Sequence, residues 1–335
     1  MKILFAIQGT GNGHLSRARD VYPELCRHGE VDVLISGIQV DVQVPFSVKY
    51  RMYGMSFIFG KNGGVNLVAS VRKLRLRQLW RDIRTLDVKQ YDLVVNDFEE
   101  ISAWAACMRH VPCVALSHQW AVKHKAAPKA KHPDWRGIVL LKWYAPCKQG
   151  YGFHFRPYAT GLFTPVIRRE VREQTVTNNG HITVYLPAYD EAVLLPFLQY
   201  FKEIKWEVFS KHSKEERVEE NVHVRPVNNT AFIQSMAASN GVFMGAGFEG
   251  PAEALFLGKK LIVIPMQDQY EQQCNAAAMA QLGVPIMKRL HPKYREQMQS
   301  WLDEKNPRIE VDFPNQTAAI VDEMLREFLK TRKKV

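Results

Sequence analysis

The chain has 335 residues, of which 46% are hydrophobic and 24% charged, and its formal net charge is +11. This length and globular composition predict two folded domains rather than one. No apolar run approaches the roughly 20 residues that span a bilayer, which argues against a transmembrane helix. The positive charge admits nucleic acid, an anionic membrane surface or a phosphorylated substrate as a partner, and by itself does not choose among them.

The start of the chain and its cysteines indicate a cytoplasmic protein. Met1 and Lys2 lead directly into an apolar run over residues 3–7, which is typical of a first buried strand and not of a signal peptide. The cysteines are odd in number, widely scattered and without a C-x-x-C pair: Cys26, Cys107, Cys113, Cys147 and Cys274. We therefore expect reduced thiols, with no disulfide framework and no zinc site.

Short apolar runs alternate with helical stretches along the whole chain, a pattern typical of α/β proteins. In the first half, parallel strands are expected at residues 2–8, 31–36, 92–96 and 112–117. In the second half they are expected at 182–186, 206–210, 222–225, 241–244 and 261–265. Because the runs are continuously apolar, helices should cover both faces of each sheet.

The boundary between the two halves is expected in residues 155–180, which contain prolines, a charged run and a polar turn. This predicts an N-terminal domain over 1–160 and a C-terminal domain over 161–316, each Rossmann-like and doubly wound, with a cleft between them. Residues 317–335 should form a final helix with one apolar face, packed back on the N-terminal domain.

A glycine cluster at residues 9–14 follows the first expected strand and should open a helix at about Leu15. Gly11, Asn12 and Gly13 are expected to form a loop that binds phosphate or the acceptor. His14 would then face the crevice where open α/β sheets bind ligands, and a neutral imidazole there could deprotonate an acceptor hydroxyl. The alternative is a histidine that only caps the helix or binds a phosphate.

The same cluster argues against a dinucleotide site. His14 occupies the place of the third glycine in G-x-G-x-x-G, and the second expected strand ends without an acidic residue for a ribose.

Acidic side chains follow the strand expected at 92–96. Asp97 is the best candidate to orient His14, as a carboxylate does in catalytic triads. Glu99 and Glu100 are more simply explained as caps of the following helix. His118, after the strand at 112–117, is a weaker second candidate for a base.

A second glycine cluster follows the strand that ends at residue 244, and it is expected to bind the donor: Gly245, Ala246, Gly247, Phe248, Glu249 and Gly250. Pro251 suits a helix start and Gly258 a helix stop, so a helix is expected over 252–257. A diphosphate would sit at its amino end. Glu253 could hold two ribose hydroxyls, or could only be a favourable acid in the first turn.

Residues 265–275 are rich in glutamine, acid and asparagine at the end of the next strand. Such a segment suits hydrogen bonding to the hydroxyls of a sugar, and a solvated loop is the alternative.

Two basic stretches remain. Residues 72–84 alternate arginine or lysine with leucine, tryptophan and isoleucine, which predicts a helix with an apolar stripe and a cationic face. Residues 123–136 mix lysine, histidine and tryptophan. Both could lie on anionic lipid, as a lipid-linked acceptor would require, or could belong to an ordinary packed helix and an acceptor loop. No DNA- or RNA-binding module is evident, so nucleic acid is not expected as a partner.

At these residues the chain resembles GT-B glycosyltransferases. The glycines at 245, 247 and 250, followed by Glu253, Gly258, Glu271-Gln272, Asn275 and Gly283, are similar to the donor signature of UDP-glycosyltransferases. The pattern is also similar to the bacterial N-acetylglucosaminyltransferase that completes the lipid-linked peptidoglycan precursor. The amino-terminal Gly-x-Gly-x-Gly-His14-x-x-Arg17 resembles the start of the same superfamily, so the resemblance spans essentially the whole chain.

The resemblance implies that Glu253 binds the donor ribose, that residues 245–250 bind the diphosphate, and that Val227 and its neighbours meet the base. It also implies that Glu271 and Gln272 bind the donor sugar and that His14 lies beside the reaction centre. The usual Asp-Gln pair is Glu-Gln here, and the plant-type histidine that opens the donor motif is absent. These departures leave the donor sugar open.

The expected activity is therefore transfer of a sugar from a nucleotide sugar, UDP favoured, to a hydroxyl acceptor with inversion. No cofactor is required, and no acidic pair marks a metal site. Two alternatives stay open: a nucleotide-sugar 2-epimerase, and a non-catalytic nucleotide-sugar-binding protein.

Overall fold

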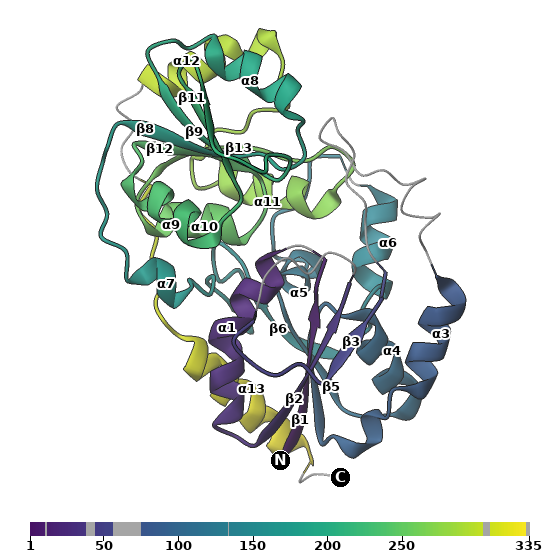
Figure 1. Cartoon of the computed structure of the whole chain (residues 1–335). Coiled ribbons are helices and arrows are strands. Elements are labelled where there is room, and N and C mark those ends of the chain that lie inside the picture. Colours follow the sequence, from purple (N-terminus) through teal and green to yellow (C-terminus); the bar gives the residue numbers. More distant parts are fainter. Residues whose placement is uncertain (11, 38–43, 56–74, 133, 304–308, 333–335) are drawn as a thin grey trace.

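The computed structural model describes residues 1–10, 12–37, 44–55, 75–132, 134–303 and 309–332. It shows two open α/β sheets, one in each half of the chain, with helices on both faces of each sheet (Figure 1). The expected fold class, two Rossmann-like doubly wound domains, is confirmed.

In the described residues the first sheet has seven parallel strands in the order β3-β2-β1-β4-β5-β6-β7. The strands are β1 (Lys2–Gln8), β2 (Glu30–Ser36), β3 (Tyr50–Met52), β4 (Leu93–Asp97), β5 (Cys113–Ser117), β6 (Gln149–Phe153) and β7 (Leu162–Phe163). The four expected strands are confirmed, whereas β3, β6 and β7 were missed because they are short or rich in glycine. Strand β7 carries this sheet beyond the boundary expected at residue 160.

The second sheet has six strands in its described part, in the order β10-β11-β9-β8-β12-β13. They are β8 (His181–Tyr185), β9 (Lys205–Ser210), β10 (Arg217–Glu219), β11 (Val222–Pro226), β12 (Gly241–Gly245) and β13 (Lys260–Ile264). All five expected strands are present and parallel. The edge strand β10, which pairs antiparallel with β11, was missed because it is three residues long.

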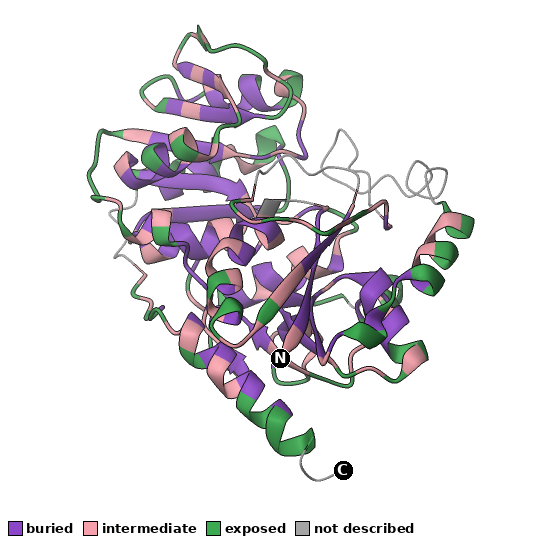
Figure 2. Cartoon of the chain, turned by 60° about the horizontal axis from the view of Figure 1, so that its bottom comes forward, coloured by how far each residue is buried: buried purple, intermediate pink, exposed green. Residues whose placement is uncertain are grey.

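Helices cover both sheets, and exposed residues lie on the helices and loops while the strands are largely buried (Figure 2). In the first half they are α1 (Asn12–Cys26), α3 (Leu76–Thr85), η1 (Val88–Gln90), α4 (Glu100–Arg109), α5 (His118–Lys123) and α6 (Trp135–Trp143). In the second half they are α7 (Arg169–Arg172), α8 (Glu191–Gln199), α9 (Asn229–Ala238), α10 (Glu249–Phe256), α11 (Tyr270–Ala280), η2 (Pro292–Tyr294), α12 (Arg295–Asp303) and α13 (Thr317–Arg332).

The last helix, α13, returns to the N-terminal domain and lies against α1 (Figure 1). Its buried apolar residues join the core that also contains Leu15 and Val21 of α1. Two side-chain contacts tie it to the first domain: His28 Nε2 lies 2.7 Å from Asp322 Oδ1, and Arg332 Nη1 lies 2.8 Å from Asp92 Oδ1. The chain therefore crosses between the domains twice.

Both glycine-rich helix starts lie earlier than expected. Helix α1 begins at Asn12 rather than at Leu15, and α10 begins at Glu249 rather than at Ala252. The first four N–H groups of a helix have no partner within it, so glycines and Pro251 cost little there. As a result His14 lies in the first turn of a helix, not on a loop. The expected loop residue Gly11 lies outside the described residues.

Strand β6 packs closely on α5 at Gly152. A Cβ atom at this position would lie 2.7 Å from both the Cβ and the backbone nitrogen of Ala121. We expect Gly152→Ala to lower the free energy of unfolding by about 1–3 kcal/mol, since neither neighbour is flexible. Urea denaturation measures this.

The matched control is Gly247→Ala, because a Cβ at Gly247 would meet no described atom within 4 Å. It should keep the wild-type stability to within about 0.5 kcal/mol. Equal stability of the two variants would show that the close contact of β6 with α5 is wrong.

Candidate active site

The carboxyl ends of β1 and β4 bring His14 and Asp97 together. The two strands are neighbours, with Ile7 opposite Asp97, and α1 starts just after β1. His14 Nδ1 lies 2.9 Å from Asp97 Oδ1, and Asp97 is only 1% exposed. The expected contact is therefore present. Because the carboxylate accepts the Nδ1 proton, the lone pair of the neutral ring is on Nε2.

Arg17, one turn further along α1, neutralises the same carboxylate. Its Nη2 lies 2.6 and 2.7 Å from the two oxygens of Asp97, and its Nη1 donates to Glu249 at the start of α10. Arg17 thus joins the His14–Asp97 pair to the second domain. The sequence contained Arg17 within the amino-terminal pattern, but its role emerges only from this contact.

These charges set the protonation of the pair. Burial alone lowers the pKa of His14, but Asp97 outweighs burial, and the pKa of His14 is raised above its ordinary value despite the opposing charge of Arg17. Burial alone raises the pKa of Asp97, but Arg17 and His14 outweigh it, and the pKa of Asp97 is lowered. The carboxylate is therefore ionised near neutral pH.

The two glycine clusters face each other across the domain boundary. A Cβ at Gly13 would collide with the carboxylate of Glu249, so the absence of a side chain lets α1 and α10 approach. Between β12 and α10, Ala246 is fully buried and its carbonyl accepts from Asn275 Nδ2 at 3.2 Å. Space remains open beside Gly247, where a methyl group in place of the hydrogen would meet no described atom within 4 Å.

His118 lies in the contact between the two domains. Its ring stacks on Phe248, with centroids 3.8 Å apart, and its Nδ1 and Nε2 contact Phe153 O at 2.8 Å and Asn275 Oδ1 at 2.7 Å. The ring is 1% exposed. Both nitrogens are therefore engaged at the domain boundary, and the suggestion that His118 is a second base stays a prediction. Phe248, expected at the donor, is likewise buried in this contact.

Glu253 is ion-paired in the structure. Its two oxygens accept from Arg168 Nε at 2.5 Å and Arg168 Nη2 at 2.7 Å, and Arg168 also contacts Asn229 Oδ1 at 2.6 Å. Arg168 belongs to the segment between the domains, and Glu253 is 2% exposed. A ribose would therefore have to compete with this arginine, and binding of the ribose by Glu253 stays a prediction.

The two residues expected at the donor sugar differ in their surroundings. Glu271 Oε2 accepts from Gln119 Nε2 at 3.0 Å, which brings it to the His14 side of the domain boundary. Gln272 Oε1 accepts from the backbone nitrogen of Met266 at 3.0 Å and so holds the loop after β13. Sequence reasoning missed Gln119, although its place directly after β5 was a usable signal.

Three further expected residues lie on β11, α1 and α4 or directly beside them. Val227, expected beside the base of the donor, is 38% exposed just after β11. Asn12 is the first residue of α1. Glu99 caps α4 as expected, accepting from the backbone nitrogens of Ile101 and Ser102.

Glu100 is not a cap, contrary to expectation. It is fully buried and accepts from the backbone nitrogen of Met55. Burial, together with the neighbouring Glu99, raises the pKa of Glu100 to about 8.

In the basic stretch at 72–84, the start of the helix and the burial of its apolar residues differ from expectation. Arg72 and Lys73 lie outside the described residues, and α3 starts only at Leu76. In α3 only Ile83 is buried, whereas Leu76 and Trp80 are 56% and 52% exposed. The predicted apolar stripe is therefore not packed along its length against the described protein.

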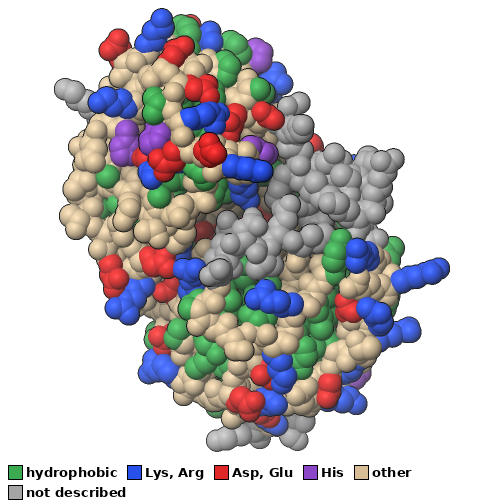
Figure 3. Space-filling model, in the orientation of Figure 1, with side chains coloured by type: hydrophobic (Ala, Val, Ile, Leu, Met, Phe, Trp, Pro, Cys, Tyr) green, Lys and Arg blue, Asp and Glu red, His purple; other side chains and the backbone are tan. Residues whose placement is uncertain are grey.

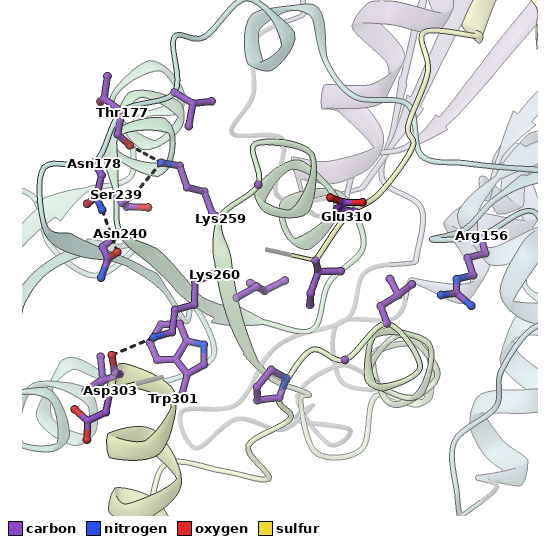
Figure 4. A pocket seen from close by; sticks show the side chains of 18 residues that line it. Arg156, Thr177, Asn178, Ser239, Asn240, Lys259, Lys260, Trp301, Asp303 and Glu310 are labelled. Atoms are coloured by element: carbon purple, nitrogen blue, oxygen red, sulfur yellow. Dashed lines mark hydrogen bonds between the residues drawn. The ribbon is translucent and has the colours of Figure 1, made fainter. Parts of the chain in front are cut away.

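Figure 3 shows a hollow between the two domains, with charged side chains near its rim. A different cavity, of about 860 Å³, lies at the amino ends of β12 and β13 (Figure 4). Lys259 beside it donates to Thr177 O at 2.6 Å and Ser239 O at 2.8 Å. None of the expected site residues lines this cavity. In the described ranges there is no group of three or more His, Cys, Asp or Glu residues that could hold a metal ion.

The raised pKa of His14 predicts a pH dependence of stability. A group whose pKa is higher in the folded state stabilises the fold fully below its unfolded pKa, near 6.5, and this contribution is lost as the pH rises through the folded value. We expect the stabilisation that His14 gives the wild type to begin to fall at about pH 6. It should be lost once the pH exceeds the folded pKa of His14. Urea denaturation of wild type and His14→Gln across that range measures it. Parallel curves for the two proteins would contradict the His14–Asp97 interaction.

Comparison with known proteins gives the family and the fold of the chain. The family described as "Glycosyl transferase family 1" matches residues 1–304. Among curated proteins, none matches the sequence significantly. Solved structures similar to the chain include the glycosyltransferase SnogD from Streptomyces nogalater, with 15% identity and a TM-score of 0.54 over 98% of this chain and 96% of that chain.

Two further structures are similar over nearly their whole length. MnaA of S. aureus, solved with UDP, has 9% identity and a TM-score of 0.64 over 98% of this chain and 97% of that chain. MurG of Acinetobacter baumannii has 14% identity and a TM-score of 0.54 over 100% and 99%. At these identities the likeness shows the fold, while the family match spans most of the sequence. The chain therefore belongs to glycosyl transferase family 1 and has the two-domain GT-B fold.

Proposed function

We propose that this glycosyltransferase moves a sugar from a UDP-sugar to a hydroxyl group of an acceptor, with inversion at the anomeric carbon. The observation that carries the proposal is the His14–Asp97 pair, 2.9 Å apart, beside the start of α10 and Glu271 of the other domain. Family membership supports glycosyl transfer, and the similar MnaA was solved with UDP.

In the proposed reaction His14 is the general base. The acceptor oxygen attacks the anomeric carbon while the bond from that carbon to the diphosphate oxygen breaks. The hydroxyl proton goes to His14 Nε2, and UDP leaves with the electron pair of the broken bond. Asp97 stabilises the imidazolium that forms, since its carboxylate already accepts the Nδ1 proton.

The leaving diphosphate is assigned to the loop of residues 245–250 and the amino end of α10. Free backbone N–H groups and the helix dipole favour an anion there. Because these groups hold the charge, we propose a reaction that needs neither a metal ion nor a cofactor. Whether a hexosyl or an N-acetylhexosaminyl group is transferred depends on contacts around Glu271 and Gln272.

The acceptor is proposed to be lipid-linked, and the enzyme to act in the cytoplasm at an anionic membrane surface. No helix in the described ranges is long and apolar enough to cross a bilayer. Helix α6 supports binding at the surface, because Trp135 and Trp143 are 68% and 53% exposed, next to Arg136 and Lys142. Aromatic and basic side chains together favour the interface of anionic lipid.

Replacing Trp135 and Trp143 by serine tests this surface. The double variant should lose most binding to vesicles that contain anionic lipid, because it removes the two largest exposed apolar groups of α6. Co-sedimentation with phosphatidylglycerol vesicles measures the loss, and replacing Tyr200 and Val218, exposed in the second domain, is the control. Equal binding by both variants would argue against α6 as the membrane surface.

Binding of the donor is tested by thermal stabilisation with UDP, other nucleoside diphosphates and UDP-sugars. A ligand at 100 times its Kd stabilises by about 2.7 kcal/mol. Gly247→Val places a side chain in the open space beside the loop and should abolish this stabilisation. Glu253→Ala is a less clean variant, since it leaves the buried Arg168 unpaired. Lack of stabilisation of the folded wild type by every compound would refute the donor site.

Turnover tests the role of His14. His14→Ala should retain UDP binding and lose about 10²–10⁴-fold in kcat, measured as UDP released in the presence of acceptor or, more slowly, water. A 2-epimerase would instead convert the UDP-sugar to its epimer without any acceptor. A non-catalytic protein would bind the donor with no turnover and no effect of His14.

A further inference from the structure

Gln119, the second residue of α5, links the two domains at the proposed reaction centre. Its Nε2 lies 3.3 Å from His14 Nε2 on α1 and 3.0 Å from Glu271 Oε2 on α11. The residue is only 5% exposed. One amide group of the N-terminal domain therefore contacts both the proposed base and the carboxylate expected to hold the sugar.

The hydrogen-bond partners fix how this amide is oriented. A carboxylate oxygen accepts, so the atom that faces Glu271 is the amide nitrogen. His14 donates its Nδ1 proton to Asp97, and its Nε2 lone pair accepts from the same nitrogen. The two N–H bonds of Gln119 are thus both used, one in each domain.

The carbonyl oxygen of the Gln119 amide differs from its nitrogen. Gln119 Oε1 is buried and has no hydrogen-bond partner among the residues that the structure describes. Buried side-chain oxygens without a partner are uncommon in native proteins, because an amide that loses its water must recover a hydrogen bond elsewhere. A donor group supplied by a bound ligand would satisfy this oxygen.

We propose that Gln119 binds the sugar of the donor: Oε1 accepts a hydrogen bond from a hydroxyl of the sugar, while Nε2 holds Glu271 in place. This inference rests on the proposed function, since it requires a nucleotide sugar in the cleft. A hydroxyl is the suitable group because it can donate to Oε1 and accept from a neighbour at once.

The same contact affects the base. The N–H of Gln119 occupies the lone pair of His14 Nε2 that must receive the proton of the acceptor. The acceptor hydroxyl therefore displaces this N–H, and Gln119 remains attached through Glu271 and the sugar. Gln119 therefore contributes to the position of His14 as well as to recognition of the sugar.

Isothermal titration of wild type and Gln119→Met tests the proposal, because methionine matches glutamine in length and lacks polar hydrogen-bonding groups. The probes are UDP, UDP-glucose, UDP-galactose and UDP-N-acetylglucosamine. For the UDP-sugar that the wild type binds, Kd should rise about tenfold, the effect of one lost hydrogen bond to the substrate. The Kd of UDP, which has no sugar in this position, should stay within about twofold.

Two further variants complete the experiment. Gln199→Met, at the end of α8, is the matched control and should bind every probe as the wild type does. Gln119→Glu keeps the size and polarity of glutamine in case methionine prevents folding. It should show the same selective loss of UDP-sugar affinity, because its carboxylate repels Glu271.

A readout on His14 does not depend on any ligand. The N–H bond from Gln119 stabilises the neutral imidazole, so Gln119→Met should raise the pKa of His14, measured by NMR titration of the imidazole protons. A side chain that only fills space would leave this pKa unchanged.

The outcomes separate the two proposals. A wild type that binds neither UDP nor any UDP-sugar overturns the donor assignment and this inference with it. A wild type that binds both, with equal weakening or no weakening of UDP and UDP-sugar in Gln119→Met, overturns the role of Gln119 and leaves the donor site standing.

Discussion

A carboxylate buried at the end of β4 imposes the arrangement of the whole site. An ionised group that is 1% exposed is stable only when opposite charge and hydrogen bonds replace its lost water. Asp97 obtains both from α1, from His14 and from Arg17. The register of β1 and β4 places the start of α1 above Asp97, so the parallel sheet itself positions the proposed base.

Arg17 links the buried Asp97 to the second domain. A guanidinium has more donors than one carboxylate can accept, and Nη1 of Arg17 reaches Glu249 at the start of α10. Close approach is possible because Gly13 has no side chain. Beside this contact, the stacked rings of His118 and Phe248 and the amide of Asn275 form the apolar and polar parts of the same boundary. The proposed base and the proposed diphosphate loop are therefore held at a defined separation.

Arg168 adds a second charge link between the segment joining the domains and α10. Its bidentate contact with Glu253 satisfies a buried carboxylate, as Arg17 does for Asp97. The two arginines approach the same short helix from the first domain and from the connection. Binding of a ribose by Glu253 would require this contact to rearrange, which would couple donor binding to the connection between the domains.

The order of apolar runs and glycine clusters was enough to predict the two doubly wound sheets. Nine strands were expected, and the structure has all nine, because continuous apolar runs of five to seven residues have few other places in an α/β protein. The strands that were missed, such as β7 and β10, have two or three residues, too few for a pattern. The helix starts were misplaced by three residues, since glycine and proline are tolerated in a first turn whose N–H groups are unpaired.

The sequence by itself also indicated which residues follow the carboxyl ends of the strands, and parallel strands present these ends at one edge of the sheet. It indicated His14 with Asp97 and the loop at 245–250 on that basis. Only the tertiary structure decided their partners: Arg17 on Asp97 and Glu249, Arg168 on Glu253, and Gln119 between His14 and Glu271. These contacts join residues 80 to 232 positions apart. The contacts with Asp97 and His14 follow from how helices pack on the first sheet, and those with Glu249 and Glu271 from how the two domains pack. No local pattern of hydrophobicity or charge encodes either.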